Sequence, residues 1–339
     1  MTVSKTFRPW GPIQWLLPKL PGEKWSLLGV LGTEDRCVAT LAALRSNLRI
    51  SRLLKILDPH MSPLSAFEGR FNTIQARMEE NGVSPVDVRS VDLLQDIDTI
   101  RDELASFLTA SGSRVVLDIT SMPKRWFFPL IRFLLESSDV KTLVVTYSSA
   151  MRYDDQLSSD PLPLAPIPTF DEPRLLESYD ELVVGVGFAP LGLKDLFEAD
   201  IGKIRYLFPF PPGPPNFFRN WQFLRTLEAE VENRNLRAED RWQVHMYDVP
   251  SAFEALCSVT NGACRTSALA PFGPKTLSLA MCLFALAANK AKKEPVHVYY
   301  TQPRRYGVNY TTGIGQANGS ADIKAFCIRI DGRDLYDIV

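Results

Sequence analysis

One segment strongly limits what this chain can fold into, because it passes from an apolar strand directly into a helix. Residues 115–119 are apolar apart from one aspartate, small polar residues follow, and Pro123 and Lys124 open an apolar helical stretch. Pro123 suits the first helical position, where a missing N–H costs nothing. The carboxyl edge of an open α/β sheet is where ligands bind, and a helix N-terminus at that edge favours phosphate. The segment therefore predicts an anion site.

A second copy of this pattern lies at residues 266–275, where Pro274 and Lys275 occupy the places of Pro123 and Lys124. The flanking patterns repeat as well. The first half predicts strands at 25–31, 53–57, 86–91, 114–119 and 141–147, with helices at 35–46, 67–81, 96–110 and 123–136. The second half predicts strands at 181–187, 203–208, 242–247, 264–270 and 296–301, with helices at 217–233, 251–259 and 274–288. Such alternation is typical of parallel sheets with helices on both faces.

The repeated order predicts two domains within the 339 residues. We expect an N-terminal domain at 1–153, a Pro-rich linker at 154–178 and a C-terminal domain at 179–339. The last domain is expected to end in a β-hairpin, because Asp331-Gly332 stands between two short apolar segments. The predicted fold class is thus α/β, with two tandem Rossmann-like domains, mostly parallel sheets and a C-terminal β-hairpin.

Composition narrows the possible partners. A net charge of −1 argues against binding long nucleic acid, and the longest apolar stretch, 279–288, is too short to span a bilayer. The five cysteines and three histidines are scattered without metal-ligand spacing. We therefore expect a cytoplasmic protein with no metal, no cofactor and no membrane partner.

The candidate ligand-binding residues follow from the strand order 3-2-1-4 of a doubly wound sheet. In that order the first and fourth strands are neighbours, and a crevice opens between their carboxyl ends. Glycines there let a ligand approach the backbone, hydroxyls bond phosphate or ribose, and cations neutralise it. The candidates are Gly32, Thr33, Asp118, Thr120, Ser121, Lys124, Arg152, Gly273, Lys275 and Arg305. Glu34 and Asp35 oppose an anionic ligand unless they point away or act in acid–base chemistry.

The run from Asp118 to Lys124 has the form Asp-x-Thr-x-x-x-Lys after a fourth strand, and it resembles the ligand-binding signature of CARF domains, the CRISPR-associated Rossmann-fold sensors of cyclic oligoadenylates. The tandem arrangement is similar to the fused CARF pair called SAVED. This resemblance implies that the fourth-strand loops of two halves grip one ring-shaped nucleotide in a shared groove. The second copy has Leu269 and Pro271 where the first has Asp118 and Thr120, so the two sites are chemically unequal.

These observations predict a stand-alone nucleotide sensor, or a sensor subunit with a separate effector protein, in prokaryotic antiviral defence. The expected ligand is a cyclic oligonucleotide or another phosphate-bearing nucleotide, bound by a monomer acting as a pseudo-dimer or by a homodimer. One alternative is a ring nuclease, in which the ligand's own 2′-hydroxyl attacks with help from Thr33, Ser121 or Lys124. The other is a non-catalytic partner subunit of a defence complex. Its interface would be formed by Phe210, Phe217, Phe218 and Trp221.

Overall fold

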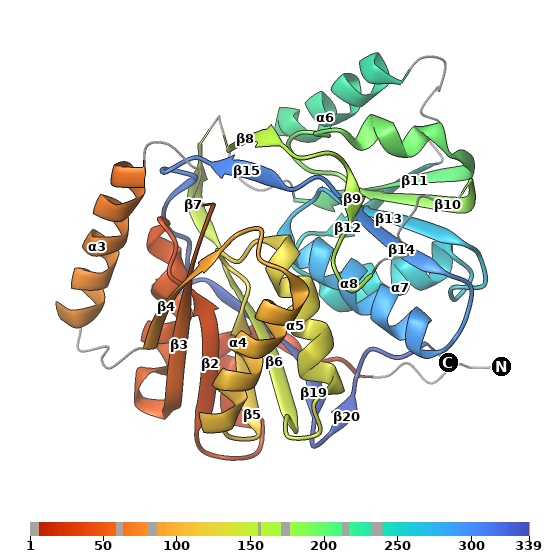
Figure 1. The fold of residues 1–339 in the computed structure, drawn as a ribbon. Helices are drawn as coiled ribbons and strands as arrows, with labels where there is room; N and C mark the ends of the chain where they lie inside the picture. Colours follow the sequence, from red (N-terminus) through yellow and green to blue (C-terminus); the bar gives the residue numbers. More distant parts are fainter. Residues whose placement is uncertain are drawn as a thin grey trace. The chain divides into compact units, whose positions relative to one another are not determined.

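The computed structural model describes residues 7–58, 64–80, 87–154, 157–170, 177–211, 217–231 and 240–338. The chain divides into two compact units. Unit 1 comprises residues 1–160 and 304–335, and unit 2 comprises residues 161–303 and 336–339. Both are mixed α/β structures whose sheets are mostly parallel, as in a Rossmann-like fold (Figure 1).

The sheet of unit 1 has the order β1-β19-β6-β5-β2-β3-β4, with β20 paired to β19. Its strands are β1 (Trp10–Pro12), β2 (Trp25–Val30), β3 (Leu48–Leu57), β4 (Asp87–Asp92), β5 (Arg114–Asp118), β6 (Thr142–Ser148), β19 (Ile323–Ile330) and β20 (Arg333–Asp334). β2 to β6 are parallel to their neighbours, and β19 runs antiparallel to both β6 and β1. The expected order 3-2-1-4 is therefore confirmed for the first half.

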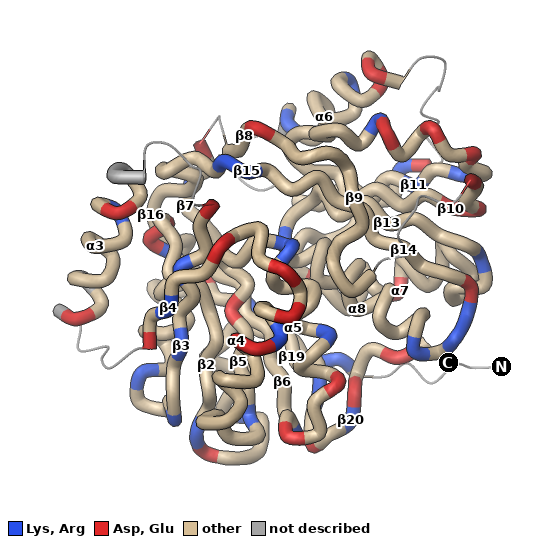
Figure 2. The backbone as a smooth tube through the Cα atoms, in the orientation of Figure 1, with Lys and Arg blue, Asp and Glu red and all other residues tan. Residues whose placement is uncertain are grey.

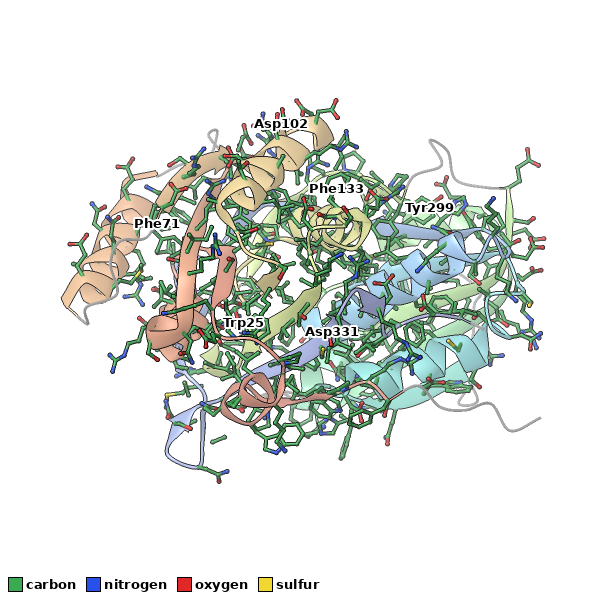
Figure 3. All side chains as sticks on the ribbon, turned by 90° about the horizontal axis from the view of Figure 1, so that it is seen from below. Trp25, Phe71, Asp102, Phe133, Tyr299 and Asp331 are labelled. Atoms are coloured by element: carbon green, nitrogen blue, oxygen red, sulfur yellow. The ribbon has the colours of Figure 1, made fainter. Side chains whose placement is uncertain are left out.

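The α-helices described in unit 1 are α1 (Ile13–Leu16), α2 (Ala39–Leu44), α3 (Leu64–Glu80), α4 (Ile97–Ala110) and α5 (Lys124–Glu136). Four of these five overlap predicted helices, α2 being shorter than the predicted 35–46, and α1 was not predicted. α4 begins where the Asp96 carboxylate accepts a hydrogen bond from the Thr99 N–H at 2.8 Å, a standard N-cap. α5 is largely buried, from Trp126 to Leu134, because its sequence is apolar around nearly the whole helix. Figure 3 shows Phe133 on this helix and Trp25 at the start of β2.

The sheet of unit 2 has the order β12-β11-β10-β13-β14-β9. Its strands are β9 (Ala165–Pro166), β10 (Ser178–Gly185), β11 (Asp200–Phe210), β12 (Arg241–His245), β13 (Ser267–Pro271) and β14 (Val296–Tyr300), and its helices are α6 (Phe217–Glu230), α7 (Val249–Val259) and α8 (Lys275–Lys290). All pairs are parallel except β14 with β9. The five parallel strands thus repeat the order found in unit 1. One core cluster packs Val184 of β10 and Tyr206 of β11 against Phe223 of α6.

The domain boundaries differ from the expected 1–153, 154–178 and 179–339. Residues 304–335 belong to unit 1, because β19 supplies backbone partners for the edge of β6. The expected linker carries β8 (Ser158–Pro161), which pairs with β15 (Pro303–Tyr306), and β9, which joins the sheet of unit 2.

The remaining strands are short. β7 (Ala150–Tyr153) pairs with β16 (Thr311–Ile314), and β17 (Gln316–Ala317) pairs with β18 (Ser320–Ala321). The predicted C-terminal hairpin is confirmed as β19–β20, turning through Asp331 at φ 49° and Gly332 at φ 80°, both in the left-handed region that Asp-Gly tolerates.

Acidic and basic residues are interspersed along the described chain (Figure 2). Among the described helices, none combines the length and the apolar character that crossing a bilayer requires.

Candidate functional site

In unit 1 the loops that follow β2 and β5 touch at the carboxyl edge of the sheet. A Cβ atom built on Gly32 would lie 3.0 Å from the Cβ of Ser121, which leaves room for glycine alone without a shift. The Ser121 hydroxyl donates to Oε1 of Glu34 at 2.9 Å. The predicted neighbours Gly32 and Ser121 are therefore brought together, as the order 3-2-1-4 requires.

A buried ion pair occupies the centre of this edge. Oε2 of Glu34 accepts hydrogen bonds from Nε and Nη2 of Arg36 at 2.9 and 2.8 Å, and from the Thr311 hydroxyl at 2.6 Å. Arg36 is 1% exposed and Glu34 is 7% exposed. Burial alone would lower the pKa of Arg36, but the Glu34 carboxylate raises that pKa well above its ordinary value. The guanidinium and carboxylate are therefore both charged, and each neutralises the other.

Two tyrosines complete the surroundings of Arg36. Its Nη1 donates to the Tyr147 hydroxyl at 3.0 Å and to the Ser148 carbonyl oxygen at 2.8 Å. The hydroxyls of Tyr147 and Tyr153 lie 2.9 Å apart, and the guanidinium carbon is 5.3 and 5.6 Å from the centres of the two rings. The side chain is thus held by charge, hydrogen bonds and cation–π contacts together.

The C-terminal segment of unit 1 closes over the same loops. In addition to the Thr311 contact, the Gly313 N–H donates to Oδ2 of Asp35 at 3.3 Å. Asp35 also pairs with Arg70 of α3 at 2.9 Å, and Arg70 donates from Nε to the Thr33 carbonyl oxygen at 2.9 Å. Both acidic residues that opposed an anionic ligand are thus paired with arginines.

Asp118 and Thr120 hold the loop after β5 in shape. The Thr120 N–H donates to Oδ1 of Asp118 at 2.8 Å, and the Thr120 hydroxyl accepts from the Ser148 N–H at 2.9 Å. Both residues are buried, at 3% and 1% exposed. The buried Ser148 hydroxyl has no hydrogen-bond partner in the described part of the chain. It is a donor and acceptor available to a ligand or to water at the end of β6.

The lysine at the start of α5 is 8% exposed. α5 begins at Lys124, one residue later than the sequence predicts, because Pro123 is extended (φ −60°, ψ 149°) and serves as the N-cap. The Pro123 carbonyl oxygen accepts hydrogen bonds from the N–H groups of Trp126 and Phe127, both at 3.0 Å. α8 begins in the same way at Lys275, after Pro274 at φ −52° and ψ 153°.

The remaining candidates in unit 1 are surface residues. Arg152 lies on β7 opposite Thr312 of β16 and is exposed. Arg305 was expected just beyond the last strand of the second half, but it belongs to unit 1. It lies on β15 and pairs with Asp160 at 3.7 Å, with both side chains about half exposed.

The carboxyl edge of unit 2 is tight at its glycines. A Cβ on Gly273 would lie 3.0 Å from the Val186 carbonyl oxygen, and a Cβ on Gly187 would overlap the carbonyl oxygen of Phe272. At this edge the Thr301 hydroxyl, just after β14, is fully buried and has no hydrogen-bond partner among the described residues. Where unit 1 has an ion pair, this edge carries backbone contacts and aromatic rings.

Arg36, Tyr147 and Thr311 are site residues that the sequence reasoning missed. Glu34-x-Arg36 in the loop after the first strand was a usable signal, since opposite charges two residues apart in a loop can pair. Thr311 gave no such sequence signal, because its segment was predicted to belong to the C-terminal domain. Within the described residues, no group of three His, Cys, Asp or Glu side chains could hold a metal ion.

Comparisons with known proteins add little. No protein-family model matches the chain, and no curated protein matches it. Among solved structures it is similar to the rRNA methyltransferase AviRa from Streptomyces viridochromogenes, at 15% identity and a TM-score of 0.24, over 44% of this chain and 76% of that one.

Proposed function

We propose that the protein binds a cytoplasmic nucleotide signal, a cyclic oligonucleotide of the kind used in prokaryotic antiviral defence, at the carboxyl edges of its parallel sheets. The site in unit 1 would consist of the loops after β2 and β5 and the first turn of α5. We also propose that the two units are tandem CARF-like domains. The equal strand order of the two sheets supports this.

One observation carries the proposal. In both sheets the first and fourth parallel strands are neighbours, and in both the helix after the fourth strand begins at a lysine behind an extended proline. The N–H groups of a first helical turn and a lysine at its start are a suitable environment for phosphate. The orphaned hydroxyl of Ser148 lies at the same edge in unit 1.

The Glu34–Arg36 pair makes this edge compatible with an anionic ligand. An unpaired Glu34 carboxylate would repel phosphate, but Arg36 cancels its charge through two hydrogen bonds. Arg70 pairs with Asp35 in the same way. Lys124 and the dipole of α5 then determine the preference for an anion.

A ring nuclease is the second candidate, because the Ser121 hydroxyl is bonded to a carboxylate. The other oxygen of that carboxylate, Oε2, however, already accepts from Arg36 and Thr311, and the paired guanidinium makes the whole carboxylate a weaker base. A carboxylate so occupied has little capacity to take a proton from Ser121 or from a ligand hydroxyl. The geometry therefore favours binding over cleavage.

Isothermal titration of the whole protein with cyclic tri-, tetra- and hexa-adenylate tests the proposal. At least one ring should release heat with a micromolar dissociation constant. Lys124→Gln should weaken that binding by about tenfold or more, since a charge-assisted contact to phosphate is lost. The matched control is Lys141→Gln, an exposed lysine just before β6 at the opposite end of the same strands, which should leave affinity unchanged.

Two results would overturn the proposal: no heat with any ring at tens of micromolar protein, or equal affinity for the Lys124→Gln and Lys141→Gln variants. Chromatography of the nucleotide after incubation separates the two candidates. An intact ring supports sensing, and linear products would reassign the protein as a nuclease.

A further inference from the structure

Exposed aromatic side chains gather at one edge of unit 2. Phe218 is 81% exposed, Phe210 is 53%, Trp221 is 48% and Phe188 is 38%. Together with Arg219 and Arg241 they are called the aromatic–arginine surface below. These four rings are most of the large hydrophobic side chains that stand exposed in the described chain. Exposed rings in such number are costly in water and mark a binding surface.

The rings come from the ends of neighbouring strands and from the helix beside them. Phe188 follows β10, Phe210 is the last residue of β11, and Phe218 and Trp221 lie in the first two turns of α6. Trp221 packs against Phe208 of β11, with ring centres 5.7 Å apart. Phe188 and Phe210 therefore lie at the carboxyl edge of the parallel strands, the ligand edge of such sheets, while Arg241 begins β12 beside Tyr206 of β11. Phe217 was predicted to join it, but its side chain lies outside the described residues.

Two arginines lie against these rings. The guanidinium carbon of Arg219 is 4.9 Å from the centre of the Phe188 ring, and that of Arg241 is 5.2 Å from the centre of the Trp221 ring. The first two turns of α6 carry Arg219, the third carries Arg225, and no acidic residue of the helix precedes Glu228. Flat rings and cations thus alternate along the start of α6, and the acidic Asp240 beside Arg241 is paired with Arg205 at 3.3 Å.

A buried polar group at the same edge also lacks a partner. The Thr301 hydroxyl is fully buried and unpaired within the described chain, and it borders the loop that carries Phe188. A Cβ built on Gly192, at the end of that loop, would lie 3.2 Å from this hydroxyl. A ligand that enters between loop and strand would find a hydrogen-bonding group there.

From this arrangement we infer that the aromatic–arginine surface stacks the bases of a short single-stranded oligonucleotide, while its arginines contact the phosphates. A nucleotide joins one flat ring to one negative charge, which matches the alternation of rings and guanidinium groups. The inference rests on the proposed nucleotide ligand and assigns base recognition to unit 2.

The experiment uses a linear fluorescein-labelled hexa-adenylate RNA and measures its fluorescence anisotropy with the whole protein. Phe218→Ala and Trp221→Ala should each weaken binding by about 5- to 100-fold, the usual effect of losing one stacked base. Arg219→Gln should reduce the dependence of affinity on salt concentration. The matched control is Trp15→Ala, because Trp15 is 47% exposed and also carries a cation, with the Lys19 ammonium 3.9 Å from its ring centre. It should leave affinity unchanged.

Equal weakening by Trp15→Ala and Trp221→Ala, or no weakening by Phe218→Ala, overturns the inference. A change of sedimentation coefficient on Phe218→Ala without any change in RNA affinity also overturns it and assigns the surface to a protein interface. The linear probe keeps this test separate from the earlier one. If rings of cyclic adenylate fail to bind but the hexamer binds through Trp221, the proposed signal is wrong and the stacking surface stands.

Discussion

The two units share a strand order but differ in what they place at the carboxyl edge of the sheet. In unit 1 the edge is polar and buried, with Glu34 and Arg36 at its centre and Thr311 closing over them. In unit 2 it is aromatic and partly exposed, with Phe218 and Trp221 facing solvent. Topology therefore fixes where a site can be, and the loop residues decide its chemistry.

The difference also teaches how each edge is stabilised. Unit 1 holds its loops through side chains and through a segment from the far end of the chain. Unit 2 holds them through backbone contact, since Gly187 lies directly against the carbonyl group of Phe272. The following predictions test this contrast, from the largest expected effect to the smallest.

Removing the buried carboxylate should have the largest effect. Glu34→Ala leaves the Arg36 charge buried without its partner, which typically costs about 3–5 kcal/mol of the free energy of unfolding. Hydrogen exchange should show faster exchange of the β2 and β5 amides, while β10 and β13 in unit 2 keep their protection. Loss of amide protection in both sheets would contradict the expectation that Glu34 stabilises the edge of unit 1 alone.

An exposed ion pair gives the control for that variant. Arg305→Ala breaks the pair with Asp160, in which both side chains are about half exposed, and should change the free energy of unfolding by less than about 0.5 kcal/mol. If Glu34→Ala proves equally mild, the Glu34–Arg36 pair does not hold the edge of unit 1 together.

The glycines of the two edges should differ in their tolerance of alanine. Gly187→Ala drives a methyl group into backbone and should cost about 1–3 kcal/mol, seen as a lower melting temperature of unit 2. Gly32→Ala in unit 1 would place its Cβ 3.0 Å from the Cβ of Ser121, a tight contact but no overlap with backbone, and should cost less. Gly69→Ala in α3 is the control. A Cβ there meets nothing within 4 Å, and a helical alanine should stabilise the chain slightly.

The smallest effect on stability is expected from the buried Cys37 thiol of unit 1. Burial raises the pKa of Cys37 to about 12, so at pH 8 it remains a thiol and should not react with iodoacetamide. Exposed Cys264 in unit 2 should be alkylated readily. The neutral thiol's contribution to stability is present below pH 9 and is lost as the pH rises toward 12. Mass spectrometry of alkylated peptides checks this, and rapid labelling of Cys37 would show that the edge is open.

The apolar periodicity was sufficient to predict the five parallel strands of each half and the main helices between them, but not β1, α1 or the short strands outside the two parallel sheets. It could not assign the partner of β19, because a half-buried strand pattern looks alike whichever sheet receives it. Residues 304–335 were therefore placed in the wrong unit, and Thr311 was missed with them. The linker was misjudged for a related reason, since Pro-rich composition is compatible with the edge strand β9.

The candidate site was predicted in part. The meeting of Gly32 with Ser121 follows from strand order, and the lysine-first helices follow from the Pro-Lys pattern. The hydrogen bond from the Thr120 N–H to Asp118 depends on loop conformation, which local sequence does not determine. The neutralisation of Glu34 by Arg36 depends on burial, which a charge pattern alone does not reveal.

The path of β19 has a consequence for biosynthesis. The ribosome releases all five parallel strands of the second sheet before it makes the strand that flanks β6. Until then the nascent first sheet ends in bare backbone donors and acceptors at β6, the kind of edge that recruits foreign strands. Translation thus starts the first sheet early and completes it late, and a stalled or clipped chain would expose that edge.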